Sequence, residues 1–420
     1  MRNRFESLRR MLTSDRFLVA WTVFYVIVLL CYTTARTYGS DLFGGGNYGF
    51  NDFFINYEGG FIRRGLLGQL LHYSWQAGFN PIIVAFCLSF ASYIVIAVYM
   101  IRQFVKRGYN VCLLTVSYML GAIGMYSLPS MRRDYMIMCA FLLVVLLWRK
   151  MKPLWWVAVA NVIVSITILC YEPFAFFAVP FGILLANVRF RNWYKSIGYW
   201  IPSMLIFLLC CKYPGNEDTF LGIWGAVRNY LSSPGIIDFI MCGVSDAIMF
   251  HLSNNFLNCS AFVPIELITI PSLFFVLYYC CNAVPVYSPQ WMALTERRYL
   301  LALLLAGMLF LSPMFTVLST DYGRTAMYVA LSAFIIYFNL SETELLQLMP
   351  TWAYKASDRI LAFVDKYFPP SRMKIVCIML FTGILYCTNG GIMSAIHHTE
   401  VGTVIYSFFL AFKELFHIIS

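Results

Sequence analysis

The sequence predicts an all-α membrane protein, a polytopic transmembrane helical bundle of about 11–12 spans. Two features of its composition indicate this fold class. Of its 420 residues 60% are hydrophobic, and only 12% are charged, about half the usual share of a soluble domain. A soluble protein of this length cannot bury so much apolar surface in one core, whereas lipid solvates it.

A helix needs about 20 apolar residues to cross the hydrocarbon core, and apolar runs near this length recur along the chain. We expect spans at 17–34, 81–101, 111–127, 135–148, 154–170, 174–188, 196–211, 261–281, 299–318, 325–340 and 375–387. The last apolar stretch, 401–419, is either a twelfth span or a helix on the outer surface, and its Lys413, Glu414 and His417 favour the surface. The first run lacks a convincing cleavage site, so we expect an uncleaved anchor.

The distribution of Lys and Arg predicts a cytoplasmic N-terminus. Arginines are frequent in segment 1–16, and every second loop after it is basic. The net charge of +10 is therefore a topology signal, and no nucleic-acid partner is expected. We expect a transmembrane bundle at 17–340 with outer loops 35–80 and 212–260, a cytoplasmic linker with an amphipathic helix at 341–374, and a C-terminal segment at 375–420.

Segment 61–75, which reads FIRRGLLGQLLHYSW, predicts a helix at the membrane surface, with its first turn behind Gly59 and Gly60. One side of that helix is apolar: Phe61, Ile62, Leu66, Leu67, Leu70 and Leu71. Arg64, Gly68 and His72 recur at i, i+4 and i+8 as a polar stripe. A helix N-terminus that bears Arg63 and Arg64 suits an anion. The alternative is that these two arginines contact lipid headgroups.

Charged residues on the predicted outer face gather in four short groups. They are Asp41, Asp52, Glu58, Arg63 and Arg64 in the first loop, Arg132, Arg133 and Asp134 in the second, Glu172 in the third, and Asp321 and Arg324 in the fifth. Charges at span edges are costly unless they are paired or functional. Local ion pairs such as Asp321–Arg324 could pin the helix ends of any one loop. Four groups on one surface favour a common site.

Arginines with a few carboxylates suit a phosphate-bearing substrate, because the planar guanidinium binds phosphate oxygens bidentately and a carboxylate can act as a general base. The sequence contains no Walker A motif, no CxxC pair and no HExxH. We therefore expect a lipid-anchored substrate, a polyprenyl phosphate- or diphosphate-linked sugar, with a lipid-linked or glycan acceptor. Cys242 and Cys259 lie in an outer loop and form either a disulfide or two unpaired thiols.

The long first outer loop, the acid of the second and the long loop after the seventh span resemble the GT-C superfamily of integral membrane glycosyltransferases. The strings NYEGGFIRRGLLG at 56–68 and DYGR at 321–324 resemble bacterial membrane proteins of surface-polysaccharide biosynthesis, a group that includes proposed O-antigen and capsule polymerases. The resemblance implies an inverting glycosyltransferase of the bacterial inner membrane that works on the extracytoplasmic face. Such an enzyme either adds one sugar or joins repeat units into a polymer.

In the GT-C pattern an acid of the first loop is the catalytic base, which maps onto Asp52, with Glu58 and Asp41 as rivals, and the second-loop acid maps onto Asp134. The residues expected to hold the leaving phosphate are Arg63, Arg64, Arg132, Arg133 and Arg324, supported by Asp41, Glu172 and Asp321. No clear Asp-x-Asp is present in either loop, which leaves a divalent metal possible and its ligands unknown.

Asp52 is preferred to Glu58 because it precedes Phe53-Phe54-Ile55, an apolar run that can pack down, desolvate the carboxylate and raise its pKa. Glu58 precedes Gly59-Gly60, which predicts a flexible turn. The alternative reading of Asp52 is a helix cap. The alternative function is a transporter or flippase of lipid-linked saccharides, which would place its charges deep in a central cavity.

Overall fold

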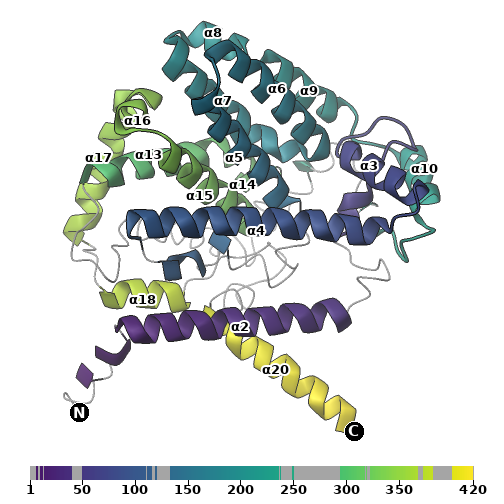
Figure 1. The fold of residues 1–420 in the computed structure, drawn as a ribbon, viewed down its shortest axis with the longest axis horizontal. Coiled ribbons are helices and arrows are strands. Elements are labelled where there is room, and N and C mark those ends of the chain that lie inside the picture. Colours follow the sequence, from purple (N-terminus) through teal and green to yellow (C-terminus); the bar gives the residue numbers. More distant parts are fainter. Residues whose placement is uncertain are drawn as a thin grey trace.

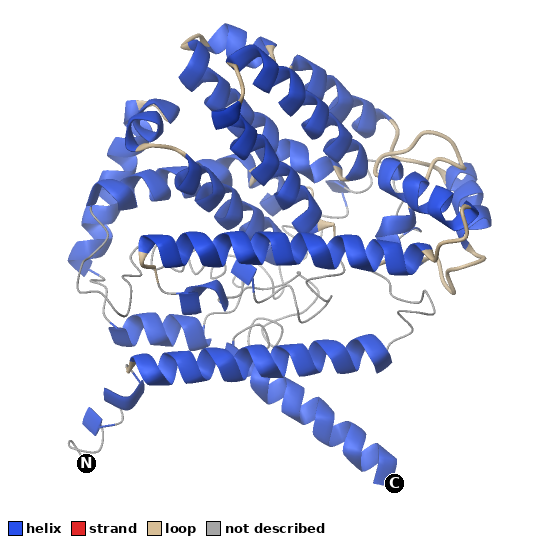
Figure 2. Ribbon diagram, in the orientation of Figure 1, coloured by secondary structure: helices blue, strands red, loops and turns tan. Residues whose placement is uncertain are grey.

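The computed structural model describes residues 6–7, 10–12, 14–39, 50–109, 111–115, 119–120, 133–235, 237, 248–249, 294–316, 318, 322–367, 372–381 and 400–419. Within these ranges most residues are helical and none lies in a strand (Figure 2). By length and composition, three helical stretches of the described residues can cross a membrane: Pro81–Arg107, Pro153–Cys170 and Glu172–Phe190. Arg16–Val28 and Ile201–Lys212 are apolar but shorter. The helical, membrane-compatible character is confirmed, while the full number of spans and their orientation stay predictions.

Helices occupy most of the predicted spans that the structure describes. They are α2 (Asp15–Gly39), α4 (Pro81–Arg107), α5 (Asp134–Lys150), α6 (Pro153–Cys170), α7 (Ala175–Phe190), α15 (Tyr322–Asn339), α18 (Arg372–Phe381) and α20 (Glu400–Ile419). Segment 401–419, for which either a span or a surface helix was expected, is the continuous helix α20. Segment 261–281 lies outside the described residues, and of 111–127 only η2 (Val111–Thr115) and residues 119–120 are described.

Two of the predicted spans are not single continuous helices. Segment 196–211 is divided between α8 (Trp193–Gly198) and α9 (Ile201–Lys212), and segment 299–318 between α13 (Leu294–Phe310) and α14 (Ser312–Thr316). A proline lies in the first turn of each second helix, Pro202 and Pro313. Proline has no N–H to continue the preceding helix, and it disfavours helical dihedrals in the residue before it.

The helix α15 forms the centre of the bundle and packs against α13 and α5 (Figure 1). Its side chains are buried on every side from Ala326 to Tyr337, as expected of a helix that is hydrophobic all round. The helix α4 lies across this bundle and leaves large apolar side chains such as Ile83, Val98 and Val105 exposed. Exposed apolar surface of this kind suits contact with lipid acyl chains.

The predicted linker 341–374 holds two helices, α16 (Glu342–Leu348) and α17 (Thr351–Tyr367), and α17 is the expected amphipathic one. Ion pairs tie this region to loops that were predicted to be cytoplasmic. Arg149 at the end of α5 lies 3.1 Å from Glu344, and Arg297 lies 3.1 Å from Asp365.

Figure 1 places two further helices near the N-terminal end of α4, across the molecule from α16 and α17. They are α3 (Gly65–Gln76) and α10 (Glu217–Val227), and both belong to loops that were predicted to lie outside. Together with the short 3₁₀ helix η1 (Asn51–Phe54) they share a separate apolar cluster. Buried side chains from each element meet there, including Phe54, Leu71 and Ile223. The described parts of the two long loops, which were predicted to lie outside, therefore share one apolar core beside the bundle.

Candidate functional site

The first outer loop is held rigidly against α3 and α10. A methyl group on Gly68 would lie 1.9 Å from the Ile55 carbonyl oxygen, and one on Gly59 would lie 2.2 Å from the Thr219 carbonyl oxygen. Glycine at 59 allows two backbones to touch, whereas a Cβ on Gly60 would meet nothing within 4 Å. The flexibility of the Gly59-Gly60 turn stays a prediction.

The predicted helix 61–75 begins later than expected, at Gly65, so Arg63 and Arg64 precede its first turn. Arg64 adopts the left-handed conformation, with φ of +66°. The predicted polar stripe does not face water, since Gly68 and His72 are buried. The buried side also holds apolar Leu67 and Leu71, and the exposed side presents Leu70 and Tyr73. Large exposed apolar side chains suit a helix whose outward side faces lipid.

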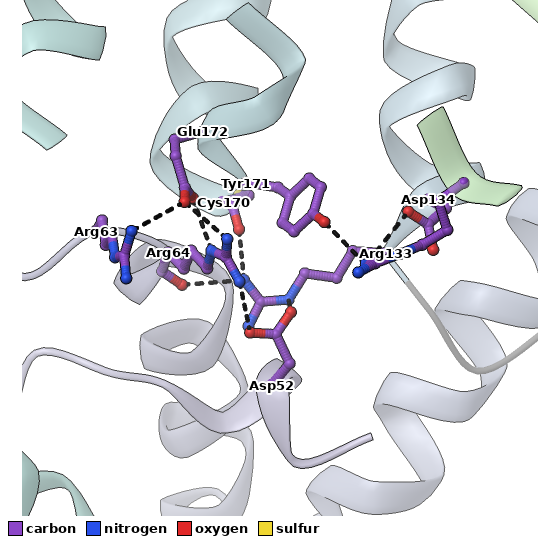
Figure 3. Close-up of polar contacts among 9 residues, drawn as sticks. Asp52, Arg63, Arg64, Arg133, Asp134, Cys170, Tyr171 and Glu172 are labelled. Atoms are coloured by element: carbon purple, nitrogen blue, oxygen red, sulfur yellow. Dashed lines mark hydrogen bonds and ion pairs between the residues drawn. The ribbon is translucent and has the colours of Figure 1, made fainter. Parts of the chain in front are cut away.

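Arg64 is joined to Glu172 by two hydrogen bonds (Figure 3). Its Nε donates to Glu172 Oε2 and its Nη2 to Oε1, both at 2.7 Å, and Arg63 Nη1 lies 3.6 Å from the same Oε1. Glu172 begins η6 (Glu172–Phe174), the turn between α6 and α7. The guanidinium of Arg64 also lies over the ring of Tyr171, 4.8 Å from its centroid. The left-handed backbone and these contacts together fix the direction of the Arg64 side chain.

Asp52 lies between two arginines from different loops. Its Oδ1 is 3.4 Å from Arg64 Nη1, and its Oδ2 is 3.5 Å from Arg133 Nε. Arg133 is almost completely buried, and its Nη1 donates to the backbone carbonyls of Arg64, at 3.2 Å, and Cys170. No side-chain capping bond is formed at η1, where Asp52 is the second residue, so the reading of Asp52 as a helix cap is wrong.

Asp134 is the first residue of α5 and lies at the other end of the cluster. Its Oδ1 accepts a hydrogen bond from the Tyr328 hydroxyl and lies 4.0 Å from Arg324 Nη1. Arg324 Nη1 also donates to the Tyr171 hydroxyl at 3.0 Å, which links this end to the Arg64–Glu172 pair. Asp134 and Arg324 come from loops that are far apart in the sequence, and Tyr171 bridges them to the first loop.

All four groups of outer charges thus meet in one network. Its charged members are Asp52, Arg63, Arg64, Arg133, Asp134, Glu172 and Arg324. Asp41, Arg132 and Asp321 lie outside the described residues, as do Cys242 and Cys259. Glu58 is described but contacts another set of residues, Gln69 and His72 on α3.

The expected rise in the pKa of Asp52 is wrong. The apolar run behind it does pack down, and burial acts to raise its pKa as anticipated. The charges of Arg133, Arg64 and Arg324 outweigh that effect and hold the pKa of Asp52 below its ordinary value. For Arg64, burial acts to lower the pKa, but the charges of Glu172 and Asp52 raise it well above the ordinary value. Both groups are therefore ionised at neutral pH.

Three polar atoms of the network are buried without a hydrogen-bond partner. They are Nε and Nη2 of Arg133 and Oδ2 of Asp134. Buried donors and acceptors are nearly always satisfied in native proteins, so these atoms point to places where a ligand or water completes the site. No three His, Cys, Asp or Glu side chains cluster as metal ligands in the described part of the chain. The possible divalent metal therefore has no described ligand set.

Sequence reasoning missed Tyr171 and Tyr328. Their hydroxyls tie Arg324 and Asp134 into the network. Tyr171 directly precedes Glu172 and could have been selected for that reason. Tyr328 lies inside an apolar helix, one turn after Arg324. Only this spacing, which puts the two residues on one side of the helix, could have indicated that Tyr328 belongs to the site.

No protein-family model, curated protein or solved structure matches this chain. The GT-C resemblance accordingly stays an expectation drawn from the loops and the two strings. A function for this protein has to be inferred from the chemistry of the arginine–carboxylate network itself.

Proposed function

We propose that this protein is a membrane glycosyltransferase that uses polyprenyl-phosphate-linked sugar donors at the extracytoplasmic face of a bacterial inner membrane, in cell-surface polysaccharide biosynthesis. One observation carries the proposal: four separate loops bring arginines and carboxylates into a single buried network at the ends of the helices. Either single-sugar transfer or repeat-unit polymerisation is compatible with such a site.

The composition of the network suits an anionic ligand. Among the described residues, four guanidinium groups, those of Arg63, Arg64, Arg133 and Arg324, lie beside the carboxylates of Asp52, Asp134 and Glu172. Guanidinium groups form strong, charge-assisted hydrogen bonds with phosphate oxygens. Arginine suits that task because its fork matches phosphate geometry, and Arg133 Nη2 still has a hydrogen bond to offer.

The same contacts give Asp52 a role that depends on substrate. Its two arginine contacts are long, at 3.4 and 3.5 Å, so a phosphate bound to Arg64 and Arg133 where they stand would compete with the carboxylate for their charge. The added negative charge would raise the pKa of Asp52 and make it a stronger base. Substrate binding would thus switch the base on.

In the proposed reaction, Asp52 accepts the proton of an acceptor hydroxyl. The hydroxyl oxygen forms a bond to the anomeric carbon of the donor sugar as the bond from that carbon to the phosphate oxygen breaks, with inversion. The arginines stabilise the negative charge that develops on the leaving phosphate, a contribution that is often the largest in catalysis.

A transporter or flippase of lipid-linked saccharides is the rival class. Transporter sites usually lie near the bilayer midplane, in the middle of discontinuous helices. Here Asp134 opens α5, Glu172 follows the end of α6, and Arg324 lies in the first turn of α15. Placement at helix ends supports a site at one membrane face and favours the transferase.

The proposal is tested first by binding. The purified protein in lipid nanodiscs should bind a polyprenyl phosphate much more tightly than the polyprenol of the same length, and Arg133→Gln should remove most of that difference. Equal affinity of the wild-type protein for the phosphate and the alcohol would contradict the proposal.

A further inference from the structure

A second polar cluster lies on α3, apart from the arginine network. Gln69 Nε2 donates to Glu58 Oε1 at 2.9 Å, and His72 Nε2 lies 3.8 Å from the same oxygen. The Glu58 side chain is 41% exposed, whereas that of Asp52 is 12% exposed. Glu58 is thus a carboxylate that is positioned by its neighbours and open to a ligand.

Two further polar groups of this cluster are buried and lack a hydrogen-bond partner: His72 Nδ1 and the Tyr230 hydroxyl. The Gln76 side-chain amide lies 3.1 Å from His72 Nε2, so that ring nitrogen has a partner while Nδ1 has none. His72 is 7% exposed, and an unpaired polar nitrogen in so buried a ring is costly. A ligand with hydrogen-bonding groups would satisfy both of these atoms.

Tyr230 belongs to this cluster by its position. Its ring packs against Trp75, with ring centroids 5.2 Å apart, and against Phe54, at 5.7 Å. Burial and the nearby charge of Glu58 both raise the pKa of Tyr230, so its hydroxyl keeps its proton. The hydroxyl is therefore held beside the α3 cluster as a group that can donate and accept.

The combined groups suit the hydroxyls of a neutral sugar. Glu58 accepts hydrogen bonds, and the unpaired His72 Nδ1 and Tyr230 hydroxyl can each pair with a sugar hydroxyl, because a hydroxyl both donates and accepts. A phosphate is disfavoured by the charge of Glu58. His72 lies two turns into α3, and Arg64 directly precedes that helix, so one element carries groups of both sites.

We infer that Glu58, His72 and Tyr230 form a saccharide subsite, which binds hydroxyl groups of the donor sugar while the arginine network holds its phosphate. The inference rests on the proposed function and adds to it the groups that recognise the sugar. Such a subsite also discriminates between sugars, because a ligand that lacks a matching hydroxyl leaves buried groups unpaired.

The inference is tested by comparing sugar-bearing and bare lipid phosphates. Affinities of the full-length protein in nanodiscs would be measured for undecaprenyl phosphate and for the same lipid carrying glucose, galactose, mannose or N-acetylglucosamine. The wild-type protein should bind at least one sugar-bearing lipid about tenfold or more tightly than the bare lipid, as expected from one to two hydrogen bonds.

Glu58→Gln and Tyr230→Phe should each reduce that gain to about threefold or less and leave the affinity for bare undecaprenyl phosphate within about twofold. Tyr230→Phe removes a single oxygen atom, so it keeps the packing on Trp75 and Phe54. Tyr73→Phe is the matched control, because this exposed tyrosine follows His72 on the outward side of α3. It should leave every affinity unchanged.

Two results would overturn the inference. One is that no sugar-bearing lipid binds more tightly than the bare lipid. The other is that the gain survives in both Glu58→Gln and Tyr230→Phe. Neither result touches the proposed function, which fails separately if the affinity for bare undecaprenyl phosphate does not depend on Arg133.

Discussion

Arg64 and Glu172 are separated by 108 residues in the chain, yet two hydrogen bonds of 2.7 Å join their side chains. The pair fastens the first outer loop to the turn between α6 and α7. Because the Arg64 backbone adopts a left-handed conformation that costs energy for a non-glycine residue, the surrounding contacts must hold it there. Strain of this kind clusters at functional sites.

Arg64→Lys tests whether the fork geometry of this arginine serves catalysis. A lysine keeps the charge beside Glu172 but cannot form the bidentate contact, so sugar transfer should fall about 30- to 1000-fold, or roughly 2–4 kcal/mol. Arg149→Lys is the control, since Arg149 is half exposed and pairs with Glu344 at the distant side. Equal steady-state rates for Arg64→Lys and wild type would contradict this role. They would indicate that Arg64 only contacts lipid headgroups.

Gly222→Ala and Gly225→Ala form a matched pair on α10. A methyl group on Gly222 would lie 2.5 Å from the Gly59 Cα, whereas one on Gly225 meets nothing within 4 Å. Gly222→Ala should destabilise the packed outer loops by about 1–3 kcal/mol, and Gly225→Ala should be neutral or stabilising by up to about 1 kcal/mol. Thermal unfolding in detergent measures both. Equal midpoints would show that α10 does not press against the first loop.

The lowered pKa of Asp52 predicts a pH dependence of stability. In the unfolded chain Asp52 titrates near its ordinary value of 3.8, and in the folded protein it titrates lower, because Arg133 and Arg64 outweigh burial. Its ionised form therefore stabilises the fold at all pH values above about 4, and the stabilisation is lost as the pH falls towards the folded pKa. The wild-type midpoint should fall on acidification from about pH 4 more steeply than that of Asp52→Asn. Parallel curves would contradict the ion pairs.

Membrane topology is tested by reporter fusions. A reporter placed after Ser130, or within 216–233, should lie outside the cytoplasm, and one placed after Lys152 or at Lys355 should lie inside it. A cytoplasmic signal from 216–233 would put α3 and α10 on the wrong side for an extracytoplasmic transferase.

The sequence predicted which charged residues lie together at the site. It could not predict which of them form ion pairs with each other. Charges at span edges in loops of one face have to lie at one surface, which is why Asp52, Arg133 and Arg324 were selected together. Which carboxylate takes which arginine depends on side-chain directions. Arg133 and Asp134 are neighbours in the sequence and could have formed a local ion pair, but Arg133 lies beside Asp52 and Asp134 beside Tyr328.

The apolar runs predicted where the helices lie. They did not predict which side chains of α3 are buried. The periodicity of 61–75 predicted an apolar side and a polar stripe. In α3, Leu67 and Leu71 of the predicted apolar side are buried together with His72 of the polar stripe, whereas Leu70 is exposed. His72 and Gln69 were therefore overlooked as partners of Glu58.

Glycosyl transfer from a lipid-linked donor by Asp52→Asn is the most direct measurement of the proposed mechanism. Purified wild type, Asp52→Asn and Glu58→Gln would be supplied in proteoliposomes with polyprenyl-phosphate-linked radiolabelled sugars and a lipid-linked glycan acceptor. Asparagine preserves the shape of the Asp52 side chain and removes its basicity, so Asp52→Asn should fold, bind donor and transfer no sugar, while wild type transfers it. Wild-type turnover by Asp52→Asn would contradict the mechanism, and it would assign the base to Glu58 if Glu58→Gln were inactive in the same assay.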